Sequence, residues 1–256
     1  MHQDSVESFV SARGRRPAWP GIDKALRPTT IEDGYRLRNA IHGRLMAAGD
    51  ARVGWKVGST SASGQRGFGL SEPVYAGLFA SGRSATLAEA LRRPLARPSV
   101  ECEIAVVLGK DIDGADPALS VATVTDAIGA CHFGCEIIDS RYDDPAAVGV
   151  PSLIADDFFQ VGFVVGAENT GWRTQDLTAA EGFIEIDGQR WNGSVRDVLT
   201  AFDSLLWLAK ALARGGLSLH SGDIVLTGTL VPPKPVPLPA RAVSMGITGF
   251  ESMALS

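Results

Sequence analysis

The most constraining feature of this sequence is an apolar strand pattern interrupted by two glutamates, Val100-Glu101-Cys102-Glu103-Ile104-Ala105-Val106-Val107-Leu108. Side chains alternate along a β-strand, so Glu101 and Glu103 are expected on one face and their apolar neighbours on the other. Two adjacent carboxylates in apolar surroundings repel each other and resist desolvation. The pattern therefore predicts a neutralising partner, and a hard divalent cation bound through oxygen atoms is the most direct one.

A third glutamate has a similar setting, because Glu136 opens the short apolar strand pattern Glu136-Ile137-Ile138. Three carboxylates on strands predict a facial, all-oxygen site that leaves positions for water and substrate and suits Mg²⁺ or Mn²⁺. The alternative is that these glutamates lie at strand edges and face solvent, as most single glutamates do. On the residues alone, both interpretations stay open.

Composition excludes several classes of protein. The chain has 256 residues, a net charge of −5, 45% hydrophobic residues and three cysteines. No basic stripe indicates nucleic-acid binding, and no apolar run reaches the roughly 18 residues of a membrane span. Three cysteines do not predict a disulfide framework. We therefore expect a cytoplasmic protein with no nucleic-acid or membrane partner.

Periodicity gives a coarse set of elements. Thr29 and Glu32 have capping-box spacing and predict the start of a helix. Asp187-Gly188 predicts the turn of a β-hairpin. The pattern further predicts helices over 30–48, 120–131 and 195–213, an extended segment over 1–28, a loop-rich stretch over 61–80, a Pro-rich connector over 232–239 and a final strand pair near 241–248 and 250–254.

Four motifs follow one another along the chain in a specific order and spacing. They are Trp55-Lys56-Val57-Gly58-Ser59-Thr60-Ser61, Glu101 to Leu108, Glu136-Ile137-Ile138-Asp139-Ser140-Arg141-Tyr142 and Ser221-Gly222-Asp223-Ile224-Val225-Leu226-Thr227-Gly228. Together they resemble the fumarylacetoacetate hydrolase superfamily, and within it the 2-keto-4-pentenoate hydratase / 4-oxalocrotonate decarboxylase branch.

The resemblance runs from about residue 30 to the end of the chain. It implies an α+β fold, a mixed β-sheet roll with flanking helices, in dimers or higher assemblies. We expect an N-terminal helical and extended segment over 1–75 and a metal-binding catalytic β-roll core over 76–256.

The resemblance also implies a chemistry. Glu101, Glu103 and Glu136 correspond to the family's metal ligands, and a divalent ion there would bind the C1 carboxylate and C2 oxygen of a short 2-oxo or 2-hydroxy-dienoic acid from aromatic catabolism. Lys56 corresponds to the active-site lysine, which would balance the substrate's charge or move a proton. Near a metal and partly buried, it is expected to have a lowered pKa. The residues expected to hold the substrate's oxygens are Ser59, Thr227, Gly228 and Thr229.

Departures from the family pattern leave the reaction open. Val74 stands where hydratases of this branch carry an aspartate, which favours the decarboxylase side. Asp156-Asp157-Phe158-Phe159 occupies the place where the family has an acidic residue followed by Asn-Ala-Ser, so this chain lacks the family's serine there. His42 is interpreted as a surface or packing histidine, which leaves no histidine base for a C–C hydrolase. The alternatives are thus a metal-dependent hydratase, a decarboxylase, an acylpyruvate hydrolase and a non-enzymatic scaffold that binds a 2-oxo acid.

Overall fold

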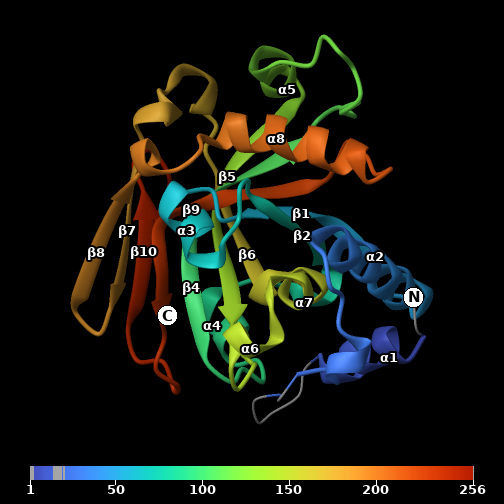
Figure 1. Cartoon of the computed structure of the whole chain (residues 1–256). Helices are drawn as coiled ribbons and strands as arrows, with labels where there is room; N and C mark the ends of the chain where they lie inside the picture. Colours follow the sequence, from blue (N-terminus) through green and yellow to red (C-terminus); the bar gives the residue numbers. More distant parts are fainter. Residues whose placement is uncertain (1–2, 14–18, 20, 256) are drawn as a thin grey trace.

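A computed structural model describes residues 3–13, 19 and 21–255. Two β-sheets form its centre, a seven-stranded mixed sheet in the order β2-β1-β9-β4-β5-β6-β3 and a four-stranded antiparallel sheet in the order β11-β10-β7-β8 (Figure 1). The predicted α+β class, a mixed β roll with flanking helices, is confirmed. The strands are β1 Arg52–Gly58, β2 Val74–Phe79, β3 Arg83–Ser84, β4 Pro98–Leu108, β5 Ile128–Asp139, β6 Gln160–Glu168, β7 Glu181–Ile186, β8 Gln189–Ser194, β9 Ile224–Pro235, β10 Val243–Ile247 and β11 Met253–Ala254.

Helices flank the sheets (Figure 1). The α-helices are α1 Gln3–Ala12, α2 Ile31–Ala47, α3 Ala62–Phe68, α4 Leu87–Leu91, α5 Val121–Asp126, α6 Pro145–Val148, α7 Val150–Ala155 and α8 Ala201–Arg214. Short 3₁₀ turns are η1 Lys24–Leu26, η2 Ala80–Gly82, η3 Asp157–Phe159, η4 Trp172–Thr174, η5 Leu177–Ala179 and η6 Val195–Asp197. No helix among the described residues is long and apolar enough to cross a membrane.

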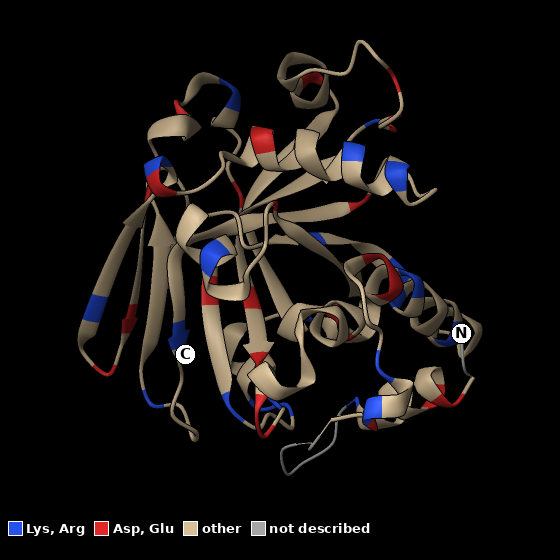
Figure 2. Cartoon of the chain, in the orientation of Figure 1, with Lys and Arg blue, Asp and Glu red and all other residues tan. Residues whose placement is uncertain are grey.

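The central strands carry the main apolar core on one face. On β4, Cys102, Ile104 and Val106 are almost fully buried, as the alternation of the sequence predicts. A second apolar cluster joins α1, α2 and α7 through Phe9 and Ile41, among others. Figure 2 shows acidic residues within the central strands, while Lys, Arg, Asp and Glu are interspersed over the outer elements. Burial of the apolar face of β4 in the core thus determines the direction in which the opposite face, with its glutamates, points.

Several predicted elements are confirmed with shifted ends. The capping box of α2 joins Thr30 to Asp33 and not Thr29 to Glu32, so the helix begins one residue later. Helix α8 begins at Ala201, capped by Thr200, and the residues before it form a 3₁₀ turn. The Asp187-Gly188 hairpin joins β7 to β8, with positive φ at both residues. Strands β10 and β11 account for the final pair.

Other predictions are wrong. The helix predicted over 120–131 ends at Asp126, because Ile128 and the residues after it pair with β4. The stretch 61–80 holds α3 and β2, and the segment 1–28 contains α1, although residues 1–2, 14–18 and 20 lie outside the described part. The Pro-rich connector begins inside β9. The domain division at residue 75 stays a prediction; β1, on its N-terminal side, pairs with β9 in the main sheet.

Candidate metal centre and substrate cavity

Strand register brings three glutamates onto one face of the main sheet. In the antiparallel pairing of β4 with β5, Glu101 lies opposite Glu136, and Glu103 lies opposite Gly134. Directly opposed residues project from the same face, and Glu103 shares that face because it is two residues from Glu101. One carboxylate oxygen from each glutamate lies within 4.8 Å of the other two. The sequence-predicted cluster therefore has the compactness that one small cation requires.

Burial and mutual repulsion both disfavour the ionised form of these carboxylates. Glu103 is 1% exposed and Glu136 0% exposed, while Glu101 is partly buried. Burial, followed by the nearby charge of Glu136, raises the pKa of Glu101 to about 8. Burial and the charges of Glu136 and Glu101 also raise the pKa of Glu103 well above its usual range. Within the described residues, Oε2 of Glu136 is buried without a hydrogen-bond partner.

Lys56 is the cation that the fold places beside these carboxylates. It lies on β1 with 2% of its surface exposed, and its Nζ is 3.1 Å from Glu136 Oε1. Nζ also donates a hydrogen bond of 3.2 Å to the carbonyl oxygen of Phe158. Burial alone would lower the pKa of Lys56, but Glu136, Glu101 and Glu103 outweigh it and raise that pKa. In this arrangement Lys56 is an ammonium, and the lowered pKa expected beside a bound metal ion stays a prediction.

A bulge in β9 holds Glu103 in place. The pairing of β4 with β9 changes register between Glu103 and Ala105, opposite the turn at Gly228. The backbone N–H of Gly228 donates a 2.7 Å hydrogen bond to Glu103 Oε2. Gly228 has a φ of +107°, and a Cβ at this position would lie 2.5 Å from Thr60 Cγ2. Glycine is therefore required both by the left-handed backbone and by the close approach of Thr60.

The glutamates open into a cavity of about 820 Å³, whose wall includes Lys56, Glu101 and Glu103. Ser59, with a φ of +55°, and Thr229 also line it. The Thr229 hydroxyl donates a 2.5 Å hydrogen bond to the carbonyl oxygen of Val231. Thr227 and Gly228 are not among the residues that line this cavity. The Thr227 hydroxyl instead donates a 2.8 Å hydrogen bond to the Ile104 carbonyl oxygen. Contact of these four residues with substrate remains a prediction.

Beside Lys56 lies a turn that the sequence did not reveal. Asp157, Phe158 and Phe159 all have positive φ, at 55°, 47° and 69°, a costly conformation for non-glycine residues. The turn presents the Phe158 carbonyl to Lys56 and both aromatic rings to the cavity. No sequence signal marks three successive left-handed residues, although the acidic pair Asp156-Asp157 precedes them.

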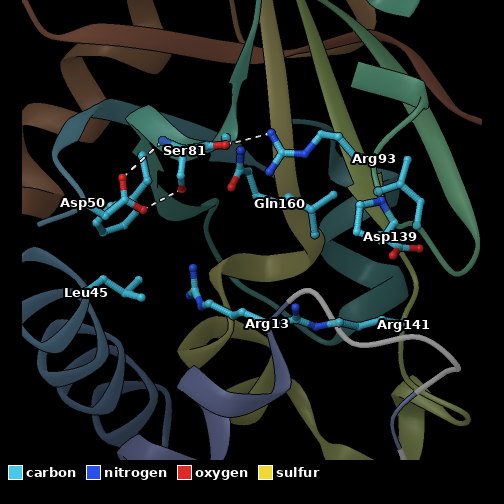
Figure 3. A pocket seen from close by; sticks show the side chains of 13 residues that line it. Arg13, Leu45, Asp50, Ser81, Arg93, Asp139, Arg141 and Gln160 are labelled. Atoms are coloured by element: carbon cyan, nitrogen blue, oxygen red, sulfur yellow. Dashed lines mark hydrogen bonds between the residues drawn. The ribbon is translucent and has the colours of Figure 1, made fainter. Parts of the chain in front are cut away.

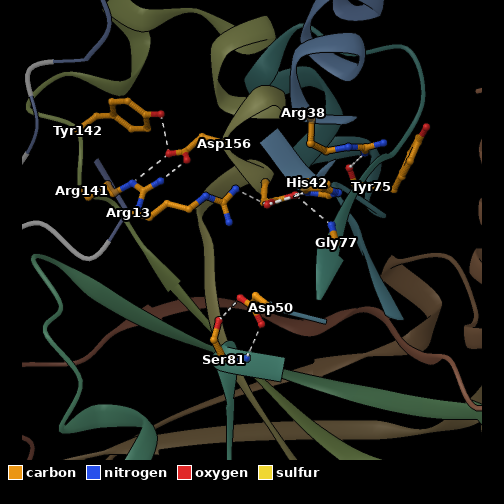
Figure 4. A network of polar contacts seen from close by, with 11 residues as sticks. Arg13, Arg38, His42, Asp50, Tyr75, Gly77, Ser81, Arg141, Tyr142 and Asp156 are labelled. Carbon is orange, nitrogen blue, oxygen red and sulfur yellow. Dashed lines mark hydrogen bonds and ion pairs between the residues drawn. The ribbon is translucent and has the colours of Figure 1, made fainter. Parts of the chain in front are cut away.

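Asp157 anchors this turn from within the protein, through contacts with Arg13, His42 and Gly77, which Figure 4 labels. Its carboxylate is fully buried, lies 2.8 Å from His42 Nε2 and accepts hydrogen bonds from Arg13 Nη2 at 2.5 Å and from the backbone N–H of Gly77 at 3.0 Å. Burial opposes ionisation, but His42 and Arg13 outweigh it and hold the pKa of Asp157 far below its usual range. His42 is therefore a buried partner of a carboxylate and is not part of the wall of the 820 Å³ cavity.

The neighbouring Asp156 is also buried, and it accepts hydrogen bonds from the Arg141 guanidinium and, at 2.7 Å, from the Tyr142 hydroxyl. Arg13 and Arg141 contribute to a second, smaller cavity of about 200 Å³ near Gln160 (Figure 3). This cavity shares no lining residue with the larger one. Arg13 and Arg141 are thus paired with aspartates, and Arg93, which also lines this cavity, donates a 2.8 Å hydrogen bond to the Ser81 carbonyl oxygen.

Comparison with characterised proteins gives close sequence relatives. The chain is 32% identical over 210 residues to the TodF product hydratase of Pseudomonas putida F1, which covers 81% of this chain and 77% of that protein. It is 33% identical over 248 residues to a 2-keto-4-pentenoate hydratase of Burkholderia vietnamiensis, covering 91% of this chain and 90% of the relative. No protein-family model matches the chain.

Solved structures agree on the fold. The 4-oxalocrotonate decarboxylase of Pseudomonas putida G7, complexed with calcium and acetate, superposes with a TM-score of 0.83 at 24% identity and covers 99% of this chain and 97% of its own. The fumarylpyruvate hydrolase of Pseudomonas aeruginosa, with Mn²⁺ and pyruvate, gives a TM-score of 0.57 at 16% identity, covering 80% of this chain and 88% of its own. The chain therefore belongs to the 2-keto-4-pentenoate hydratase family, and it shares its fold with the 4-oxalocrotonate decarboxylase.

Proposed function

We propose that this protein is a divalent-metal-dependent lyase, a hydratase of short 2-hydroxy-dienoic and 2-oxo-enoic acids that uses Mg²⁺ or Mn²⁺. The observation that carries the proposal is the convergence of Glu101, Glu103 and Glu136, with one oxygen of each within 4.8 Å of the others, beside a cavity that Glu101 and Glu103 line. The relatives named 2-keto-4-pentenoate hydratase and 2-hydroxyhexa-2,4-dienoate hydratase support the reaction class and its place in aromatic catabolism.

The residues present fit such an ion. Three carboxylates supply the oxygen ligands that hard divalent cations prefer, and Oε2 of Glu136 lacks any other partner among the described residues. Lys56 neutralises one of the three charges, and burial makes the remaining repulsion expensive. Solved relatives complexed with calcium, magnesium or Mn²⁺ support divalent-metal use.

A bound divalent ion would act as a Lewis acid toward the 2-oxo acid and stabilise negative charge that develops at its C2 oxygen. Lys56 would place its ammonium beside the same charge and donate a proton from Nζ, and the amine left by that donation could take a proton back. The Phe158 carbonyl and Glu136 orient this ammonium, which limits its rotation. Ser59 and Thr229 on the cavity wall would bind the substrate's carboxylate, and the bulge at Thr227 and Gly228 would position Glu103.

Decarboxylation is the second candidate, and Val74 favours it. Val74 is buried beside Lys56, since a Cβ placed on Gly58 would lie 3.3 Å from Val74 Cγ2 and 3.4 Å from Lys56 Nζ. The position therefore supplies an apolar methyl where a hydratase could use a second proton-transfer group. Loss of CO₂ needs an electron sink and one proton. A divalent ion held by the glutamate cluster would supply the sink, and Lys56 could supply the proton without that second group.

One assay set separates these reactions. The Mg²⁺-loaded protein is incubated with 2-hydroxypenta-2,4-dienoate, 4-oxalocrotonate or acetylpyruvate, while ultraviolet absorbance and CO₂ release are followed. Loss of the dienoate without CO₂ is the expected result. CO₂ release from 4-oxalocrotonate alone would establish the decarboxylase, and cleavage of acetylpyruvate the hydrolase. Retained metal binding without turnover of any substrate would indicate a binding scaffold.

The proposal includes the protein's state in the cell. We expect a homo-oligomer in the cytoplasm that acts on a small organic acid and binds neither nucleic acid nor membrane. Light scattering coupled to size-exclusion chromatography measures the mass in solution directly, and a mass near the 26.9 kDa of one chain would contradict the oligomer.

A further inference from the structure

Three aromatic rings gather on one part of the large cavity's wall. The Phe68 and Phe158 ring centroids are 4.9 Å apart, those of Phe158 and Phe159 are 5.5 Å apart, and those of Phe68 and Phe159 are 6.2 Å apart. Phe68 ends helix α3, whereas the other two belong to the left-handed turn Asp157–Phe159. We call Phe68, Phe158 and Phe159 the aromatic wall. It joins segments about 90 residues apart in the chain and all three members line the cavity.

The aromatic wall begins beside the catalytic end of the cavity. The Phe158 ring centroid is 5.6 Å from Lys56 Nζ, the atom that also contacts Glu136. A substrate whose carboxylate end lies at the glutamates therefore has Phe158 next to it. Toward solvent the wall becomes more accessible, because Phe159 is partly buried and Phe68 is 37% exposed. Apolar side chains left accessible in a concave site indicate an apolar ligand group.

Charges on the rest of the wall disfavour a second carboxylate. Among the described lining residues, only Lys56 and Arg66 are cationic, and Lys56 is engaged at the glutamate cluster. Arg66 is exposed, and the acidic Asp197 also lines the cavity. A carboxylate placed against the aromatic wall would lose hydration without gaining a buried cationic partner. The wall therefore discriminates between uncharged and charged substrate tails.

The cavity is also larger than a five-carbon acid requires. Its volume of about 820 Å³ lies in the upper part of the roughly 300–1,000 Å³ range of small-molecule sites. Resting on the proposed function, we propose that the site accepts the short acids but prefers a 2-hydroxy-dienoic acid whose end far from the carboxylate carries a bulky apolar group, best an aryl group, that stacks on the aromatic wall. Phe68 and Phe159 are then specificity-determining residues, and dicarboxylic acids are poor ligands.

Equilibrium binding to the Mn²⁺-loaded protein tests this proposal with three unreactive 2-oxo acids. They are 2-oxobutyrate, 2-oxo-4-phenylbutanoate and 2-oxoadipate, which share the chelating end and differ in the tail. The phenyl acid is expected to bind at least tenfold more tightly than 2-oxoadipate. Phe68→Ala should weaken binding of the phenyl acid about fivefold and leave the affinity for 2-oxobutyrate unchanged. Phe68→Arg should shift the binding preference toward 2-oxoadipate.

Met46→Ala is the matched control, since Met46 is 43% exposed on α2 and is not among the residues that line this cavity. Equal affinity for the phenyl acid and 2-oxoadipate would overturn the inference and leave the proposed function intact. So would a preference for 2-oxoadipate that Arg66→Gln removes. Failure of all three acids to bind, despite bound Mn²⁺, would instead refute the proposed function together with the inference.

Discussion

The Lys56 ammonium lies 3.1 Å from Glu136 Oε1, and the two side chains are 3% and 0% exposed. This buried contact joins β1 to β5 across the sheet, where β9 and β4 lie between them. It supplies one positive charge to a cluster of three glutamates and leaves two carboxylates without a cationic partner at hydrogen-bonding distance among the described residues. We therefore expect the same lysine to affect both ion binding and proton transfer.

Replacing this lysine should separate those two roles. Lys56→Met keeps the aliphatic stem and is expected to reduce kcat at least about 100-fold, the lower range for loss of a general acid or base. Affinity for Mn²⁺ should stay the same or rise, because a cation that repels the metal has been removed. Steady-state kinetics and calorimetric titration with Mn²⁺ measure both effects. Lys210→Met, on the exposed face of α8, is the control, and wild-type kcat in Lys56→Met would exclude the catalytic role.

A neutral substitute for one of the proposed metal ligands should weaken binding of the ion. Glu103→Gln preserves shape but removes one charge, so Mn²⁺ affinity is expected to fall about tenfold or more, or about 1.4 kcal/mol. Glu181→Gln on β7 changes the same chemical group at an exposed position and should have no effect. Titration calorimetry on both variants, with circular dichroism to verify folding, gives the comparison. An unchanged Mn²⁺ affinity in Glu103→Gln would rule out the glutamate cluster as the metal site.

The glycine in the β9 bulge offers a test of backbone geometry. Gly228→Ala should lower both the free energy of unfolding and the affinity for Mn²⁺, because the added methyl meets Thr60 and displaces the N–H that binds Glu103. Gly222 also has a positive φ, +90°, but a Cβ there meets no atom within 4 Å. Gly222→Ala should therefore show only the backbone term, about 1–2 kcal/mol, with normal Mn²⁺ binding. Equal behaviour of the two variants in urea denaturation and titration would contradict this assignment.

Acid should destabilise the protein through Asp157 and His42. The pKa of Asp157 is depressed, so its contribution to stability is complete above its unfolded pKa near 3.9 and is lost as the pH falls toward the folded value. Burial lowers the pKa of His42, so the unfolded chain takes up a proton below about pH 6.5 that the folded chain resists. Both terms have the same sign, and the free energy of unfolding should decline from pH 6.5 downward.

Asp157→Asn checks the source of that decline. Removing one partner of a buried ion pair is expected to lower the free energy of unfolding by about 3–5 kcal/mol at pH 7 and to flatten its fall below pH 4. Asp126→Asn, at an exposed position, should change neither quantity. Urea denaturation at pH 7, 5, 4 and 3 measures the three proteins. A pH profile of Asp157→Asn parallel to that of the wild type would place the acid sensitivity elsewhere.

The parts of the candidate site that depend on neighbouring residues within one strand could be predicted from the sequence. Glu101 and Glu103 share a face because strands alternate, and the apolar residues between and after them fix which face is buried. The helix α8 was predictable for the same reason, since its apolar residues recur at helical spacing. Glu136 needed the register of β4 and β5, which the sequence suggests only through the family resemblance.

Features that depend on distant residues were not predictable. His42 and Asp157 are 115 positions apart, so no local pattern reveals their contact. The segment 120–131 has helical spacing, yet pairing with β4 takes the residues from Ile128 onward into a strand. The left-handed turn at Asp157–Phe159 runs against the preferences of its own residues and is stabilised by Arg13, His42 and Gly77.

The lysine beside the glutamates has a consequence for valence selectivity. Once ionised, Glu101, Glu103 and Glu136 carry three negative charges, and Lys56 returns one positive charge to the cluster. A divalent ion then brings the buried group to electroneutrality, whereas a monovalent ion leaves it negative and a trivalent ion makes it positive. Because uncompensated charge is disfavoured in a buried site, the fold favours doubly charged ions over sodium or a lanthanide before any preference of size or geometry applies.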